Sequence, residues 1–173
     1  MLAFAQWLES TSLSLTIKSI SWVVPLVQSI HLLAIGVVFV ALLTIALRVL
    51  GWTRTDEAFG IVLARFSPWI RYGLIVLALT GVTLVIGEPV RELMSLSFRL
   101  KMGLLAIGIS TAVAFERSLA PAVIGGGLDP DFSAAAKSDA LATVLLWLAI
   151  IFLGRAIAYD VEVWGPLSPA PRA

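Results

Sequence analysis

The chain contains no cysteine, which excludes disulfides, thiolate metal sites and lipidated thiols. Charged residues are also scarce: they make up 13% of the chain, against about 25% in soluble domains. The formal net charge is only +1, so the sequence offers no strongly basic surface and no nucleic-acid partner is expected. With 60% hydrophobic residues, the chain has more apolar side chains than a soluble core of this size could bury.

The N-terminal segment lacks the basic lead of a secretory signal peptide, because no Lys or Arg precedes its first apolar residues. We therefore expect the N-terminus to remain in the mature protein. Phe4, Trp7, Leu8 and Leu15 recur at helical spacing on one face. This pattern predicts a short helix lying at the membrane interface within residues 1–20.

Long apolar runs, by contrast, are abundant. Helices are favoured over a barrel, because the backbone must satisfy itself in lipid and barrel strands would alternate polar and apolar residues. The fold class predicted is therefore all-α: a polytopic membrane protein whose four transmembrane helices form a bundle over residues 21–160, followed by a flexible Pro-rich tail over 161–173. Four runs approach or exceed the ~17–25 residues that cross a bilayer as a helix: Trp22–Leu47, Phe66–Ile86, Leu100–Phe115 and Leu141–Ala158.

Four crossings place both termini on one side of the membrane, here named side A together with the second connection. The first and third connections then lie on side B. Lys and Arg residues divide six against six between the two sides, so the positive-inside rule gives no orientation.

His31 is the most informative polar residue in the predicted spans, because an ionisable group at membrane depth is costly and marks a functional candidate. It lies about 13 Å below the side A interface at 1.5 Å per residue, with Gln28 one turn earlier on the same face. The bundle would bring Arg99, Lys101, Met102 and Arg155 to the same depth. We name the set the side A layer; its members are His31, Gln28, Arg99, Lys101, Met102 and Arg155.

The side A layer suits more than one ligand. A b-type haem would take His31 as axial metal ligand, Arg99, Lys101 or Arg155 for its propionates, and Met102 as a second axial ligand. A quinone headgroup or an anionic lipid would use His31 as proton carrier and Arg155 as hydrogen-bond donor. A structural alternative stays open, in which the lone histidine only bonds a neighbouring helix. Membrane haem b sites commonly use two histidines, and this chain has one.

On side B, Arg71 in the second helix and Glu116 at the end of the third are placed to pair across neighbouring helices. Such a pair usually fixes packing, and that is the role predicted for it here.

Several segments resemble an uncharacterised family of small bacterial four-helix inner-membrane proteins, known only as a domain of unknown function. The resemblance extends from Phe4 to Tyr159, and it carries no activity. Family members tend to have a histidine where this chain has Glu116. They also load the first connection with basic residues, which implies a cytoplasmic side B and periplasmic termini. The segments that carry the resemblance are Trp22–Pro25, Gln28–Ala34, Leu47–Gly51, Phe98–Met102 and Gly154–Tyr159.

Two functions remain in play. The first is a non-catalytic structural or accessory membrane subunit, which contacts the lipid bilayer and either itself or a larger complex. It is supported by the lack of a catalytic constellation such as paired carboxylates or a His/Asp/Ser set, so the sequence speaks against an enzyme. The alternative is a redox or ligand-binding module, with haem b or quinone bound at His31.

Overall fold

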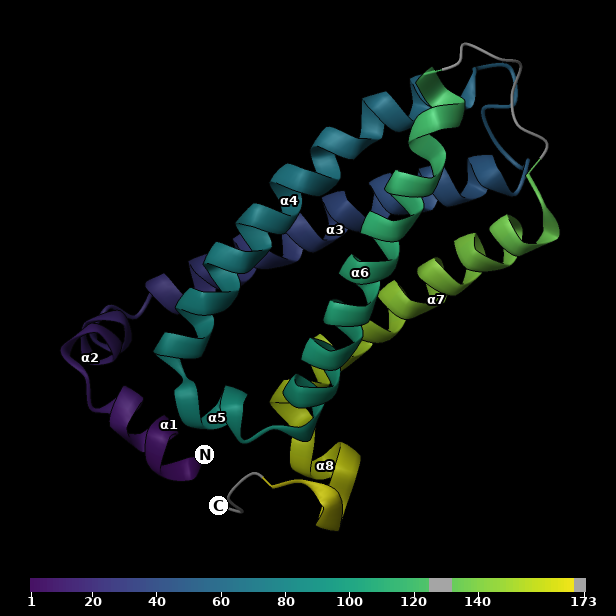
Figure 1. Ribbon diagram of the computed structural model, residues 1–173. Coiled ribbons are helices and arrows are strands. Elements are labelled where there is room, and N and C mark those ends of the chain that lie inside the picture. Colours follow the sequence, from purple (N-terminus) through teal and green to yellow (C-terminus); the bar gives the residue numbers. More distant parts are fainter. Residues whose placement is uncertain (125–131, 170–173) are drawn as a thin grey trace.

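The computed structural model describes residues 1–124 and 132–169, and within α6 it describes side chains up to residue 112. These residues are helical with short connections and include no strand. The elements are α1 (Leu2–Glu9), α2 (Ser12–Ser19), α3 (Val23–Val49), α4 (Phe59–Gly87), α5 (Pro89–Leu93), α6 (Leu96–Ile124), α7 (Ala134–Ala156), η1 (Ile157–Tyr159), α8 (Asp160–Trp164) and η2 (Gly165–Leu167) (Figure 1).

Three segments are long and apolar enough to cross a membrane: Val23–Val49, Phe59–Gly87 and Ala134–Leu167. The all-helical fold class predicted from the sequence is therefore confirmed, and three such segments are compatible with a multi-pass membrane protein. A further long helix, α6, extends over 29 residues. The helix α4 begins at Phe59, seven residues before the apolar run that starts at Phe66, and Pro68 lies inside it.

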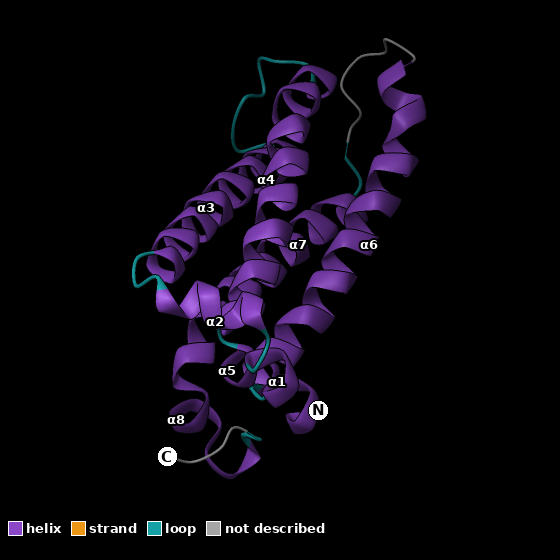
Figure 2. Ribbon diagram, turned by 90° about the vertical axis from the view of Figure 1, so that its left-hand side faces the viewer, coloured by secondary structure: helices purple, strands orange, loops and turns teal. Residues whose placement is uncertain are grey.

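The long helices pack in the order α4, α3, α7, α6. The most extensive contact joins α3 to α4, and α7 packs on both α3 and α6. The short helices α1, α2, α5 and α8 gather at one end of the long helices, which is the side A end (Figures 1 and 2). Both α1 and η2 lie at this end, so the described chain starts and finishes there.

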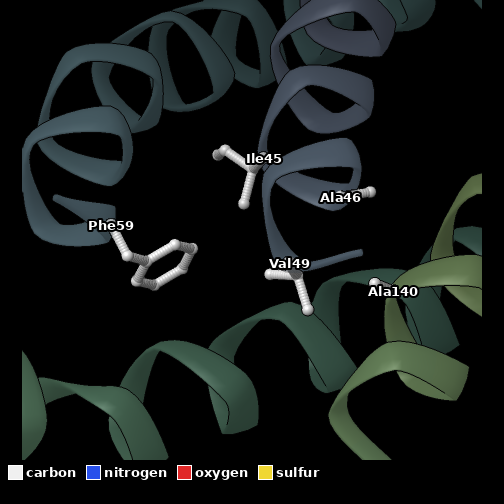
Figure 3. Packing of buried hydrophobic residues seen from close by; sticks show 5 residues of the cluster. All are labelled: Ile45, Ala46, Val49, Phe59 and Ala140. Carbon is white, nitrogen blue, oxygen red and sulfur yellow. The ribbon is translucent and has the colours of Figure 1, made fainter. Parts of the chain in front are cut away.

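A buried cluster occupies the opposite, side B end of the molecule. It joins α3, α4 and the start of α7, and Figure 3 shows Phe59 directed toward Ile45 and Val49. The Phe59 ring also meets Phe132 edge to face, at 4.9 Å between centroids. Partly buried Leu63, Phe66 and Val144 extend the contact.

The connection between α3 and α4 lies next to this cluster and is held by arginines that bond to Glu57. Buried Arg48 donates from Nε and Nη2 to the Glu57 carbonyl oxygen, at 3.2 and 2.8 Å. The Glu57 carboxylate forms ion pairs with Arg54 at 2.8 Å and with Arg65 at 2.9 Å. Arg48 is buried and helps to close the α3–α4 turn.

Close helix contact depends on glycine at two positions. A Cβ added at Gly73 would lie 2.3 Å from Val38 Cγ2, and one at Gly108 would lie 2.8 Å from Leu146 Cδ2. Small residues of this kind let helix backbones approach within a membrane.

The two ends of the chain differ from the sequence-based picture. The N-terminal segment forms two short helices instead of one, because Thr11 caps α2 by accepting from Ser14 N at 3.3 Å. The C-terminal segment, predicted as a flexible tail from residue 161, continues in helical turns through α8 and η2. Pro166 is compatible with η2 because the first turn of a helix does not need its N–H.

We predict that Gly73→Ala destabilises the protein by about 1–3 kcal/mol, because Val38 is fully buried and β-branched and has no room to yield. Thermal unfolding in detergent, followed by circular dichroism, measures the change. Gly36→Ala is the matched control, since nothing lies within 4 Å of its added Cβ. It should be neutral or stabilising by up to about 1 kcal/mol. Equal melting temperatures for the two variants would contradict the close contact.

Candidate functional site

The imidazole of His31 lies between α3 and α4. Its Nδ1 is 2.7 Å from the Thr80 hydroxyl oxygen, and the same hydroxyl donates to the Val76 carbonyl oxygen at 2.7 Å. The ring also lies against Gly81, where an added Cβ would sit 3.7 Å from Cε1. His31 is eight residues inside α3 and Thr80 seven residues before the end of α4, so both lie at the same depth from side A.

Lys101 approaches this site from α6. Its side chain lies along α7 at Gly154, where an added Cβ would be 3.5 Å from Nζ. The ammonium lies within electrostatic range of both His31 and Glu92. No hydrogen bond or ion pair is formed by Lys101 with the residues that the structure describes. We name His31, Thr80, Lys101 and Glu92 the His31 cluster.

Glu92 supplies the acidic member of the cluster from α5. It is 9% exposed, and Arg91 Nη2 lies 4.0 Å from its Oε1. Burial raises the pKa of Glu92 above its usual value, while the charges of Arg91 and Lys101 act in the opposite direction. An acid, a base and an ammonium group are therefore grouped at the side A end of the long helices.

Other members of the predicted side A layer lie apart from His31. Gln28 is exposed and shares no hydrogen bond with His31 in the described structure. Met102 is 46% exposed on α6. Arg99 donates to the Leu93 carbonyl oxygen at 3.5 Å, and Arg155 donates to the Tyr159 hydroxyl at 3.3 Å with its guanidinium over that ring. Of the predicted residues, the structure brings Lys101 alone into the cluster with His31.

The chemistry available to the cluster is that of one imidazole and one ammonium group. Within the described residues, no group of three or more His, Asp or Glu side chains could hold a metal ion. A metal ion bound by His31 would therefore need its other ligands from groups other than these side chains. The predicted pair of Arg71 and Glu116 is not tested, because the Glu116 side chain lies outside the described residues.

Asp160 accepts five hydrogen bonds from the described residues, and the sequence analysis did not identify its role. It is 4% exposed. Its Oδ1 accepts from Ser95 Oγ, Ser97 N and Ser97 Oγ at 2.8, 2.9 and 2.7 Å, and its Oδ2 accepts from Leu96 N at 3.1 Å and Ser168 Oγ at 2.6 Å. A carboxylate from the C-terminal segment thus caps the start of α6.

The capping of α6 is completed by its own residues. Ser95 Oγ accepts from Phe98 N at 3.1 Å, so the first three N–H groups of α6 all have acceptors. Trp164 Nε1 donates to Ser97 Oγ at 2.8 Å and adds a second link from α8. The sequence signal was Ser-Leu-Ser before an apolar helix, a capping pattern, but nothing local indicated that its partner is 63 residues away.

We predict that Asp160→Asn destabilises the protein by at least about 2 kcal/mol, because an amide turns a donor toward N–H and O–H groups that need acceptors. Glu162→Gln is the control, since Glu162 is exposed on the same helix and its loss should change stability by less than about 0.5 kcal/mol. Denaturation in detergent compares the two variants. A melting temperature for Asp160→Asn equal to that of Glu162→Gln would refute the capping role.

Glu92 generates a pH-dependent prediction. Its folded pKa lies above the ordinary 4.5, so the unfolded carboxyl ionises first and the free energy of unfolding falls as the pH rises above 4.5. Glu92→Gln removes this loss. The variant should therefore gain stability relative to the unsubstituted protein as the pH is raised from 4.5 toward neutrality. Melting temperatures of both proteins across this range test it, and a difference that does not change with pH would contradict the prediction.

Comparison with known proteins gives a family and no activity. No curated protein and no solved structure matches the chain. A family of unknown function, DUF6644, matches residues 4–160. This agrees with the resemblance noted in the sequence, which ran from Phe4 to Tyr159. Since the match covers most of the 173 residues, the chain belongs to the DUF6644 family, a family of unknown function.

Proposed function

We propose that the protein is a non-catalytic accessory subunit of a bacterial inner membrane, crossing it four times through α3, α4, α6 and α7. The observation that carries the proposal is that several described polar side chains bond within the chain and hold its helices together. Asp160 caps α6, Arg48 closes the α3–α4 turn, and Thr80 joins α4 to His31. Little polar chemistry is left over for a reaction.

The crossing by α6 follows from its length and its neighbours. At 29 residues and 1.5 Å per residue, it would extend about 44 Å, more than the ~30 Å hydrocarbon core. It leads away from the side A end, and α7 returns to that end (Figure 1). If α6 lay outside the membrane, α7 would lose its packing contact with α6.

The bilayer is the first partner of such a protein. Large apolar side chains are exposed along every described span, as expected of surfaces that lipid covers. Phe4 and Trp7 on α1 are 57% and 60% exposed with their rings 5.7 Å apart, and this pair would anchor α1 at the interface. Part of the apolar surface would instead meet a second copy of the chain or a larger complex. Exposed residues on the spans include Leu32, Leu33, Val40, Trp69, Tyr72, Leu79, Leu145 and Phe152.

The proposed orientation places side B in the cytoplasm and both termini in the periplasm. It is supported by Arg54 and Arg65, which surround the first connection, and by the resemblance described above.

Cysteine labelling tests the number of crossings and the orientation, because the chain has no cysteine of its own. Single substitutions at exposed positions would be reacted with a membrane-impermeant maleimide in intact cells. Four crossings predict that Ser12→Cys and Arg91→Cys react from the periplasm, while Thr53→Cys and Ser138→Cys react only after lysis. If Arg91→Cys and Ser138→Cys react from the same side, α6 does not cross.

A second candidate function is ligand binding at the His31 cluster, with haem b or quinone as the ligand. Two observations favour it. Nε2 of His31 has no hydrogen bond in the described part of the chain, and the Lys101 ammonium has no acceptor there. Groups left in this state at membrane depth are expected to meet a ligand.

A further inference from the structure

The connection between α3 and α4 brings two arginine charges to one carboxylate. Arg48, Arg54 and Arg65 all bond to Glu57. Arg48 uses the Glu57 carbonyl oxygen, which leaves the carboxylate to Arg54 and Arg65. Among the described residues, neither Arg54 nor Arg65 has a second acidic partner. Two guanidinium charges therefore share one carboxylate charge.

These two arginines are held side by side and remain accessible. Nη1 of Arg54 and Nη1 of Arg65 lie 2.8 and 3.3 Å from the same Glu57 oxygen, Oε1. Their side chains are nevertheless 38% and 49% exposed. A guanidinium group has five N–H donors, of which Glu57 takes only some. The remaining donors suit an anion with several oxygens, such as a phosphate.

Arg54 is held in a backbone conformation that arginine rarely adopts. Its φ is +52°, in the left-handed region that favours glycine or asparagine. Its guanidinium group lies over the Phe66 ring, 5.5 Å from the centroid. Residues held in strained conformations cluster at functional sites. An arginine at this position therefore indicates a role for its charge.

Exposed tryptophans place these arginines at the level of the lipid headgroups. Trp69 is 59% exposed and lies one turn after Arg65 on the same face of α4. Trp52, in the connection itself, is 73% exposed. Indole rings gather at the membrane interface. Because α4 runs inward from side B, Arg65 would lie about 6 Å outside Trp69 at 1.5 Å per residue.

We infer that Arg54 and Arg65 bind the phosphate of an anionic phospholipid in the leaflet on side B. The inference deepens the proposed function and rests on it, because the α3–α4 connection must lie at a membrane surface. Residues 48–65 carry one net positive charge, from three arginines against Asp56 and Glu57. A headgroup whose only charge is its phosphate is favoured over a zwitterionic one, since the arginines repel a headgroup ammonium.

Phospholipid titration of the detergent-purified protein tests the inference. Phosphatidylglycerol should raise the melting temperature until the effect saturates. Phosphatidylcholine has the same phosphate and a quaternary ammonium group besides, so its effect should be much smaller. Inorganic phosphate at the same concentration should give no shift, because it has no acyl chains to hold it beside the spans. Equal shifts from the two lipids, or a shift from phosphate alone, would overturn the inference.

Arg54→Asn separates loss of the site from loss of the fold. Asparagine tolerates the left-handed backbone, and the lost ion pair is exposed, so in detergent alone the variant should melt close to the unsubstituted protein. Its half-saturating phosphatidylglycerol concentration should rise about tenfold, as expected for the loss of a charged hydrogen bond. Arg65→Gln should weaken the lipid response to a similar extent.

Arg91→Gln is the matched control for both variants. Arg91 is 45% exposed and pairs with Glu88 at 2.7 Å, but it lies at the side A end. This variant should keep the lipid response of the unsubstituted protein. The same response in Arg54→Asn, Arg65→Gln and Arg91→Gln would contradict the site.

Cysteine labelling next to Arg54 separates failure of the inference from failure of the function beneath it. If Ser12→Cys and Thr53→Cys react from opposite sides but the arginine variants bind phosphatidylglycerol normally, the lipid site is wrong and the membrane subunit stands. If the two cysteines react from the same side, α3 does not cross and both proposals fail.

Discussion

Lipid offers no hydrogen-bond partner to a peptide group, and the rest of this structure follows from that constraint. The backbone meets it by forming long helices. Polar side chains within those helices meet it by bonding back to their own turns, as Ser29 does to Pro25 O, Thr44 to Val40 O and Thr83 to Leu79 O. A polar group that departs from this habit therefore has a particular role.

Two such departures define the side A end. Asp160 gives up water to accept five hydrogen bonds, four of them from the start of α6, and so couples the last turns of the chain to the third long helix. His31 and Thr80 bond across helices instead of within one. Both carboxylate oxygens of Asp160 have hydrogen-bond donors, so the role of Asp160 is structural. The second departure leaves one imidazole nitrogen without a partner among the described residues, and this asymmetry is why a ligand is proposed for His31 and not for Asp160.

The sequence predicted the features that depend on local pattern. Hydropathy located the segments that are long and apolar enough to cross a membrane. The rarity of ionisable groups singled out His31. The sequence did not predict the roles of residues whose partners are distant along the chain. No local pattern indicated the role of Asp160, because its partners, Ser95 and Ser97, lie more than 60 positions earlier. Arg155 looked like a ligand group, yet its nearest aromatic neighbour, Tyr159, engages it within one turn.

The central claim is that the fold holds His31 with Nδ1–H on Thr80 and Nε2 open. Because the chain has one histidine, ¹⁵N-histidine labelling gives a spectrum of that ring alone, and nuclear magnetic resonance of the ligand-free protein in nanodiscs reports its tautomer directly. The account predicts a protonated Nδ1 and an unprotonated Nε2. A proton on Nε2 with a bare Nδ1 would mean that Thr80 donates to the ring, and His31 would then be a packing residue with no free electron pair for a ligand.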